Sequence, residues 1–399
     1  MPKISKRANQ VIASPIRKFL PKVLATEERG LEVIKLNVGD PDLTPPSSFW
    51  RTIKNFRAKN LHYAPSSGIR EHVLAWQKYY RTFGIHLQPE NIIPTVGGAE
   101  AILLAFLTVA DPGEEILVFE PLYSSYKGFA TMAGVKLVPV TLKIEQSFVL
   151  PDRKEIRKKI NRKTKAIVVI NPNNPTGTIL SKKEIKTVIS LANQYNLFII
   201  ADETYREIIF SGLPTSFLKF PQVKNKVIVV DSVSKRFSLP GARLGCLASY
   251  NQEVMKAVLK LAMVRLSAPA LEQYGLIPLL KHPSAYTREL TAEYKRRKET
   301  VINALKKIPG IVFHEPQGAF YLLIKLPIKD VDDFVNFMLT KFNDKGRTVL
   351  MTPAEDFYIT PHLGRQELRI AYVLNCQKLK LGIGILKKGL ADYLKSEAK

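Results

Sequence analysis

The chain has 399 residues, of which 46% are hydrophobic and 24% are charged, and both fractions are typical of a globular protein. Because this length exceeds what one hydrophobic core usually fills, we expect two domains of unequal size. The longest apolar stretches, such as residues 101–110, fall well short of the roughly 20 residues that a membrane-spanning helix needs. The composition therefore excludes a disordered, fibrous or membrane-spanning protein.

The chain is strongly basic, with 60 lysine and arginine residues against 35 aspartate and glutamate residues and a formal net charge of +25. Such a charge can indicate a protein that binds nucleic acid or an anionic membrane. Here the basic residues are spread along the chain, and in residues 153–165 they alternate with apolar positions at helical spacing. We therefore expect no specific nucleic-acid partner and no membrane partner.

The amino-terminal residues carry positive charges, but no apolar stretch and no small-residue cleavage site follow them, so we expect a cytoplasmic protein. Only two cysteines occur, Cys246 and Cys376. They are too few for a disulfide framework and lack the paired spacing of zinc ligands. We expect no metal site.

The periodicity of the first 249 residues predicts an amino-terminal arm and then an α/β domain. About forty residues at the start show no clean periodicity and contain Pro2, Pro15 and Pro21, which predicts an arm rather than a folded unit. From about residue 66, short β-branched runs alternate with amphipathic stretches, as in βαβ units around a mostly parallel sheet. Strands are expected at residues 92–96, 115–119, 136–140, 166–170, 198–201, 227–230 and 244–249. Helices are expected at residues 68–80, 99–109, 124–133 and 182–195.

Beyond residue 269 the pattern changes to that of a smaller α+β domain. A long charged helix is expected at residues 284–308, a strand at 318–325 and a closing helix at 377–396. We therefore predict three parts: residues 1–44 as the arm and part of the small domain, 45–284 as the large domain, and 285–399 as the small domain.

Polar segments follow three of the predicted strands. NPNNPTG (171–177) follows the strand at 166–170, DETY (202–205) follows 198–201, and DSVSK (231–235) follows 227–230. Arg243 comes eight residues after Lys235. In open α/β sheets, ligands bind beyond the carboxyl ends of the strands. These segments therefore predict one active site to which all three contribute.

Several of these residues suit catalysis, although each also has a structural interpretation. A lysine directly after a buried strand can lose solvation, which lowers its pKa and makes the amine a nucleophile and base; Lys235 could also be an ordinary surface lysine. Asp202 could hold a buried proton or could cap a helix. Gly97, Gly98 and Ala99 open a predicted helix whose amino terminus suits an anion, although two glycines often form only a turn.

Together, these motifs resemble the class I/II aminotransferases of fold type I, the aspartate aminotransferase superfamily, over nearly the whole chain. The resemblance implies a PLP-dependent transferase fold, in which a mostly parallel seven-stranded sheet forms the large domain beside a smaller α+β domain. It implies pyridoxal 5'-phosphate (PLP) as cofactor. The implied activity is transfer of an amino group from an L-amino acid, with aspartate and glutamate favoured, to a 2-oxo acid such as 2-oxoglutarate, by a ping-pong mechanism. The implied assembly is a homodimer with shared active sites.

The resemblance also assigns roles to individual residues. Lys235 matches the Schiff-base lysine, and Asp202 matches the partner of the protonated ring nitrogen. Tyr123 matches the aromatic residue that stacks on the ring, while Asn174 and Tyr205 match donors to its phenolic oxygen. Phosphate contacts are implied for Gly97, Gly98, Ala99, Ser232 and Arg243, and for Tyr63 toward the neighbouring subunit. Substrate contacts are implied for Arg369 with the α-carboxylate, for Gly39 as the backbone donor opposite it, and for Asn174.

Some assignments stay open. Tyr63 could be a core tyrosine, and Arg369 could belong to a structural ion pair. A distal carboxylate of aspartate or glutamate needs a second cation, for which Arg17 and Arg265 are candidates. Glu100 is unfavourable near a phosphate unless it points away, and MTPA (351–354) departs from the Pro-Gly turn of many relatives.

Alternative functions are an aminotransferase for alanine or aromatic amino acids, a PLP-dependent β-lyase or another PLP reaction on the same fold, and a PLP-binding regulatory protein. The regulatory alternative is disfavoured because no space precedes the arm for a DNA-binding module. A dinucleotide-dependent dehydrogenase is disfavoured because no Gly-x-Gly-x-x-Gly links a predicted strand to a helix.

Overall fold

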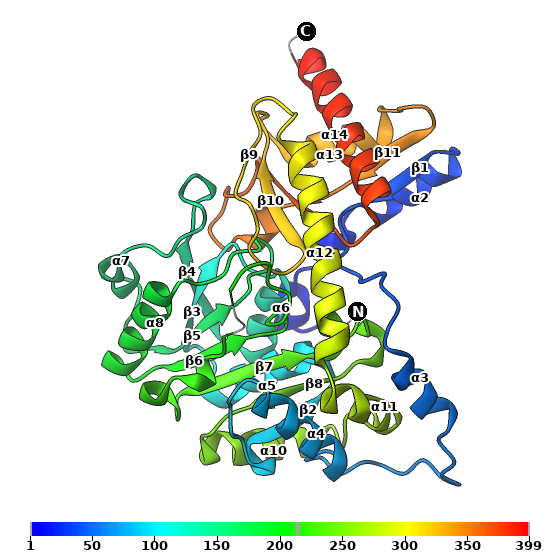
Figure 1. Cartoon of the computed structure of the whole chain (residues 1–399). Coiled ribbons are helices and arrows are strands. Elements are labelled where there is room, and N and C mark those ends of the chain that lie inside the picture. Colours follow the sequence, from blue (N-terminus) through cyan, green and yellow to red (C-terminus); the bar gives the residue numbers. More distant parts are fainter. Residues whose placement is uncertain (1, 213–214, 398–399) are drawn as a thin grey trace.

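The computed structural model describes residues 2–212 and 215–397, and its largest element is a seven-stranded sheet (Figure 1). The strand order is β2-β8-β7-β6-β5-β3-β4. Strand β8 is antiparallel to both neighbours, and all other pairs are parallel. The bounds are β2 Ile92–Thr95, β3 Glu115–Glu120, β4 Lys136–Thr141, β5 Thr164–Ile170, β6 Phe198–Asp202, β7 Val227–Ser232 and β8 Gly245–Ala248. The predicted mostly parallel seven-stranded sheet is confirmed.

Helices cover both faces of this sheet. One face packs against α5 (Gly97–Val109), α6 (Ser125–Ala133) and α10 (Gln252–Val264). The other packs against α3 (Ser47–Lys54), α4 (Arg70–Arg81), α7 (Arg153–Arg157), α8 (Lys182–Gln194) and α11 (Ala270–Lys281). Successive strand residues point to opposite faces, so Val229 and Val230 enter different cores. Burial on both faces explains why these strands are almost continuously apolar.

A second core forms around two small sheets at the other end of the molecule (Figure 1). The four-stranded sheet has the order β12-β13-β10-β9, and β1 pairs with β11. The strands are β1 Glu32–Lys35, β9 Val312–Phe313, β10 Tyr321–Lys325, β11 Arg347–Leu350, β12 Thr352–Pro353 and β13 Glu367–Ala371. The helices are α2 Leu20–Glu28, α12 Ser284–Leu305, α13 Val331–Thr340 and α14 Cys376–Glu397. The division of the chain at residues 44 and 284 stays a prediction. No helix in the described part of the chain is long and apolar enough to cross a bilayer.

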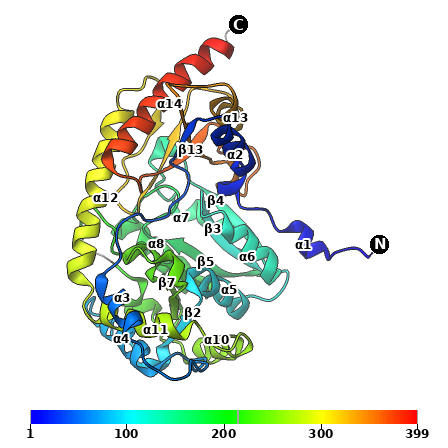
Figure 2. The same ribbon diagram turned by 90° about the vertical axis from the view of Figure 1, so that its right-hand side faces the viewer.

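The amino-terminal segment differs from the sequence-based expectation. Helix α1 (Lys6–Gln10) buries no residue and projects from the body (Figure 2), as an arm does. From Leu20 onward, however, the chain folds into α2 and β1, so the expectation of an arm over the first forty residues is wrong there. Pro21 lies in the first turn of α2, where its missing N–H is not needed. Strand β1 pairs in parallel with β11, about three hundred residues later, and no local pattern reveals such a partner.

Candidate active site

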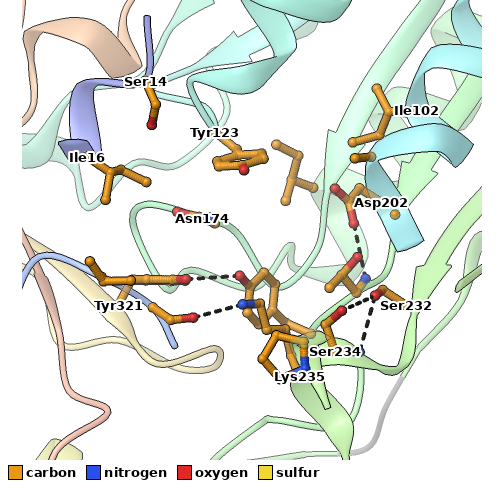
Figure 3. Close-up of a pocket in the computed structure, with 18 of the residues that line it drawn as sticks. Ser14, Ile16, Ile102, Tyr123, Asn174, Asp202, Ser232, Ser234, Lys235 and Tyr321 are labelled. Carbon is orange, nitrogen blue, oxygen red and sulfur yellow. Dashed lines mark hydrogen bonds between the residues drawn. The ribbon is translucent and has the colours of Figure 1, made fainter. Parts of the chain in front are cut away.

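A cavity of about 350 Å³ lies where β5, β6 and β7 end (Figure 3). It brings together all the expected site residues except Gly97 and Tyr63. Those in its wall are Gly39, Gly98, Ala99, Tyr123, Asn174, Asp202, Tyr205, Ser232, Lys235, Arg243 and Arg369. The three polar segments recognised in the sequence therefore meet at one place, as the carboxyl ends of neighbouring parallel strands should.

Lys235 lies on α9 (Val233–Arg236), the single helical turn that follows β7. Its Nζ donates a hydrogen bond of 2.8 Å to the carbonyl oxygen of Gly39 (Figure 3). Burial lowers the pKa of Lys235 to about 8; the cations Arg369 and Arg243 act in the same direction, whereas Asp40 opposes them. At neutral to mildly alkaline pH, a substantial fraction of this amine is therefore neutral and nucleophilic.

Gly39 contacts Lys235 through its carbonyl oxygen, whereas its expected contact is a backbone N–H to a substrate carboxylate. A Cβ at position 39 would lie 1.8 Å from the hydroxyl oxygen of Tyr321, so the close approach of this segment to Tyr321 requires glycine.

Asp202 is the last residue of β6 and is buried. Its carboxylate accepts hydrogen bonds from the Thr204 N–H (3.1 Å) and from the Tyr126 hydroxyl (3.0 Å). Burial raises the pKa of Asp202, and the hydrogen bonds from Thr204 and Tyr126 oppose that rise. No helix begins at Asp202 in the described part of the chain, so the helix-cap interpretation is wrong. A cation that enters the cavity would stabilise the ionised form of this buried carboxylate.

Another part of the cavity suits an anion. Helix α5 begins at Gly97, whose φ is +70°, and a Cβ there would lie 2.7 Å from Nη2 of Arg243. The first turn of α5 and the Arg243 guanidinium thus lie close together, with the Ser232 hydroxyl also in the cavity wall. Glu100 points away, because its carboxylate accepts the Val96 N–H at 2.7 Å. Backbone N–H groups and a guanidinium at one place have the chemistry that suits a phosphate.

Arg369 of β13 is fully buried, and it forms hydrogen bonds but no ion pair with any described residue. It donates to Asn174 Oδ1 at 3.1 Å and to the carbonyl oxygen of Asn37 at 2.7 Å, while its Nε has no partner among the described residues. Burial lowers the pKa of its guanidinium. The structural ion-pair interpretation is therefore wrong. A buried guanidinium without a counter-ion favours the binding of a carboxylate.

Two tyrosines of this region were not recognised from the sequence. Tyr321, the first residue of β10, accepts a hydrogen bond of 3.2 Å from the Tyr205 hydroxyl and places its ring 4.5 Å from the Arg369 guanidinium. Tyr126 donates to Asp202 from α6. Tyr126 lies in the first turn of α6 and Tyr123 lies just before that helix, with their ring centroids 6.5 Å apart. The short spacing from Tyr123 could have indicated its position.

Tyr63 lies outside the cavity and is 82% exposed, so the core-tyrosine interpretation is wrong. It lines an open hollow with Leu61, Val96 and Ser267. The two candidate cations for a distal carboxylate differ in their position relative to the cavity. Arg17 lines the cavity, whereas Arg265 pairs with Glu100 at 2.8 Å outside it.

Comparison with known proteins now places the chain in a family. Residues 32–383 match the family described as aminotransferase class I and II. The chain belongs to the class I and II aminotransferases. Aspartate aminotransferase of Pyrococcus horikoshii is 32% identical over 397 residues, which cover 97% of each chain. A probable aspartate/prephenate aminotransferase of Aquifex aeolicus is 29% identical and covers 98% of this chain and 99% of its own length.

Solved aminotransferase structures agree with this assignment. A single mutant of Thermus thermophilus aspartate aminotransferase superposes with a TM-score of 0.89 at 26% identity, over 98% of this chain and 100% of that chain. Alanine aminotransferase of Pyrococcus furiosus gives the same TM-score at 31% identity and the same coverage. The expected fold and enzyme class are therefore confirmed, and aminotransferases of this class use PLP.

Proposed function

We propose that this aminotransferase binds PLP in the cavity and transfers the amino group of an L-amino acid to a 2-oxo acid such as 2-oxoglutarate by a ping-pong mechanism. Aspartate and glutamate are the favoured donors. One observation carries the proposal: an amine of lowered pKa (Lys235), a buried carboxylate (Asp202) and a buried guanidinium that forms no ion pair with a described residue (Arg369) line the same cavity.

The cavity fits PLP at both ends of that molecule. The Asp202 carboxylate suits the protonated ring nitrogen, and the first turn of α5 with Arg243 suits the phosphate. The bound cofactor would supply an aldehyde that holds amines and a ring that withdraws electrons from the substrate Cα. Tyr123 would cover one face of the ring, and Asn174 and Tyr205 would donate hydrogen bonds to its phenolic oxygen.

The protein residues would transfer the proton, orient the substrate and limit contact with water. Neutral Lys235 Nζ would hold the cofactor first, and would take up and return the Cα proton once a substrate amine has replaced it. Arg369 and Asn174 would orient the α-carboxylate, so that the Cα–H bond faces Lys235. Ser14 and Ile16 from the amino-terminal segment line the same cavity and would limit its contact with water (Figure 3).

A donor panel tests the proposed reaction. Purified protein with PLP is incubated with 2-oxoglutarate and aspartate, alanine or tyrosine, and glutamate formation is followed. We expect glutamate from aspartate and parallel lines in double-reciprocal plots, the kinetic signature of a ping-pong mechanism. Release of pyruvate or ammonia without glutamate would instead indicate a β-lyase and contradict aminotransfer. Alanine is the second candidate donor, because the similar Pyrococcus furiosus structure is an alanine aminotransferase.

Arg17 is proposed to bind the distal carboxylate, since it lines the cavity and Arg265 is paired elsewhere. We expect Arg17→Met to raise KM for aspartate about 10- to 100-fold, because a hydrogen bond to a charged group contributes about 1.5 to 3 kcal/mol. KM for alanine should stay unchanged, because alanine has no distal carboxylate. Arg265→Met is the control and should leave the ratio of the two KM values unchanged. An equal rise for both donors in Arg17→Met would contradict the assignment.

We also propose a homodimer with shared active sites, in which Tyr63 reaches the cofactor phosphate of the partner subunit. Two large side chains that line one hollow are unusually exposed in the single chain: Leu61 at 59% and Tyr63 at 82%. We expect Tyr63→Phe to weaken PLP binding about tenfold without changing the dimer mass in sedimentation. A single-chain mass for the wild-type protein would contradict this proposal.

A further inference from the structure

A group of buried charged side chains lies behind the cavity wall that carries Lys235, and no role proposed above uses it. We name it the Asp231 cluster; its side chains are 0% to 8% exposed and belong to Glu203, Arg206, Glu207, Asp231 and Arg236. Two tyrosines of α4 join it, because Arg206 donates to the Tyr79 hydroxyl at 2.9 Å and Tyr80 donates to Asp231 at 3.1 Å. Neither arginine of the cluster is among the described residues that line the cavity.

The Asp231 carboxylate is the centre of the cluster, because it accepts four hydrogen bonds. Its Oδ1 accepts the Ser232 N–H and Arg236 Nη2, both at 2.7 Å. Its Oδ2 accepts Arg206 Nη2 at 2.8 Å and the Tyr80 hydroxyl at 3.1 Å. Each oxygen of Asp231 therefore accepts two hydrogen bonds, and this one side chain contacts three separate parts of the chain.

The two arginines of the cluster directly follow two site residues in the chain. Arg206 follows Tyr205 after β6, and Arg236 follows Lys235 after β7. Asp231 contacts both arginines and thus joins the segment that carries Tyr205 to the segment that carries Lys235. It also closes the turn around Lys235, since it binds the backbone before that lysine and the guanidinium after it.

Stability alone does not explain the cluster. Buried ion clusters are often no more stabilising than apolar side chains of similar volume, since the cost of removing charges from water offsets their attraction. The helix α9 has only four residues and is too short to hold its own geometry without tertiary contacts. The orientation of Lys235 therefore depends on contacts that reach outside α9, and Arg236, the last residue of this turn, makes such contacts with Asp231 and Glu207.

We propose that Asp231, Arg206 and Arg236 are positioning residues that fix Lys235 and Tyr205 relative to one another, acting from behind the cavity without touching the substrate. This inference rests on the proposed function of Lys235. Loss of the cluster should let the amine move away from its productive position, and a misplacement of about 1 Å can lower a rate on the order of 10²-fold.

The test compares Asp231→Asn, Arg236→Met and Arg236→Lys with the wild-type protein loaded with PLP. Borohydride reduction followed by peptide mass mapping first locates the cofactor in the wild type; a label elsewhere than Lys235 would contradict the proposed function itself. We then expect Asp231→Asn and Arg236→Met to shift the pH midpoint of the visible absorbance by about half a unit or more, because that midpoint reports the surroundings of the cofactor-bound amine. Their kcat should fall on the order of 10²-fold with little change in KM. Arg236→Lys keeps the positive charge and should recover part of both losses.

Glu115→Gln is the matched control. Glu115 is a buried carboxylate at the first residue of β3, at the opposite end of the sheet, where it accepts Asn161 Nδ2 at 2.7 Å. This change should lower Tm without moving the absorbance midpoint or kcat. The proposal is overturned if Asp231→Asn and Arg236→Met keep the wild-type midpoint and kcat, or change them no more than Glu115→Gln does. If Asp231→Asn does not fold, the two Arg236 variants decide by the same criterion.

Discussion

Replacing Lys235 by alanine is expected to lower kcat by about 10⁴-fold or more, the upper range for loss of a general acid–base group. Lys235 is the one lysine among the described residues of the cavity wall, so no other lysine there can replace it. The fold should survive, because within residues 2–212 and 215–397 Nζ makes a single hydrogen bond, to the Gly39 carbonyl oxygen. Glutamate formation measures the loss, and thermal unfolding followed by circular dichroism measures the fold.

Lys226→Ala is the control for the Lys235 variant. Lys226 immediately precedes β7, at the other end of that strand, and donates to the Ala192 carbonyl oxygen at 3.3 Å. We expect full turnover from this variant. A small primary amine added to Lys235→Ala should restore part of the rate, because it supplies the missing base. Turnover of Lys235→Ala near the wild-type rate would show that another group performs this work.

The lowered pKa of Lys235 also predicts a pH dependence. Burial lowers the pKa to about 8, so the amine of the cofactor-free protein is mostly protonated below that pH and mostly neutral above it. The rate of PLP attachment should rise with pH through a midpoint near pH 8 and level off above it. The pKa of Lys235 in the folded protein is below the usual lysine value. Between these two pKa values the unfolded chain binds more protons than the folded chain, so the free energy of unfolding should rise with pH over this range. Lys235→Ala should lack this rise, and an attachment midpoint near pH 10 would contradict the prediction.

The sequence was sufficient to predict the part of the site that follows the parallel strands. The segments that contain Asn174, Asp202 and Lys235 each follow a recognisable apolar run, and β5, β6 and β7 are neighbours in the sheet. The carboxyl ends of such strands meet at one edge, so the position of each segment along the chain was enough to predict where its side chains meet.

Contacts between distant segments could not be predicted in this way. Tyr321 reaches Arg369 because β10 and β13 pair antiparallel, and neither short strand indicates its partner. Likewise, Arg17 and Arg265 looked equivalent in the sequence, and only the pairing of Arg265 with Glu100, 165 positions away, separates them. The Asp231 cluster is a further example, since a conventional interpretation of DSVSK gives its aspartate no role.

Asp202→Asn is expected to lower kcat by about 10³-fold, because a buried charge without its partner costs about 3 to 5 kcal/mol. Asparagine has the shape of aspartate and can still accept the Thr204 N–H, but its amide cannot keep a ring nitrogen protonated. The loss should therefore appear in kcat for every donor, measured again as glutamate formation.

The stability of the same variant should move in the opposite direction. Burial raises the pKa of Asp202, so ionisation of this carboxylate costs the cofactor-free fold stability, and asparagine should leave Tm unchanged or raise it. Tyr126→Phe is the control: it removes one hydrogen bond to the carboxylate but keeps the charge, so its kcat should fall less than about tenfold. If Tyr126→Phe loses as much activity as Asp202→Asn, the hydrogen bond between Tyr126 and Asp202 matters more than the negative charge of Asp202. A catalytic loss in Asp202→Asn without a loss of Tm, in contrast, assigns the effect to the charge that faces the cofactor.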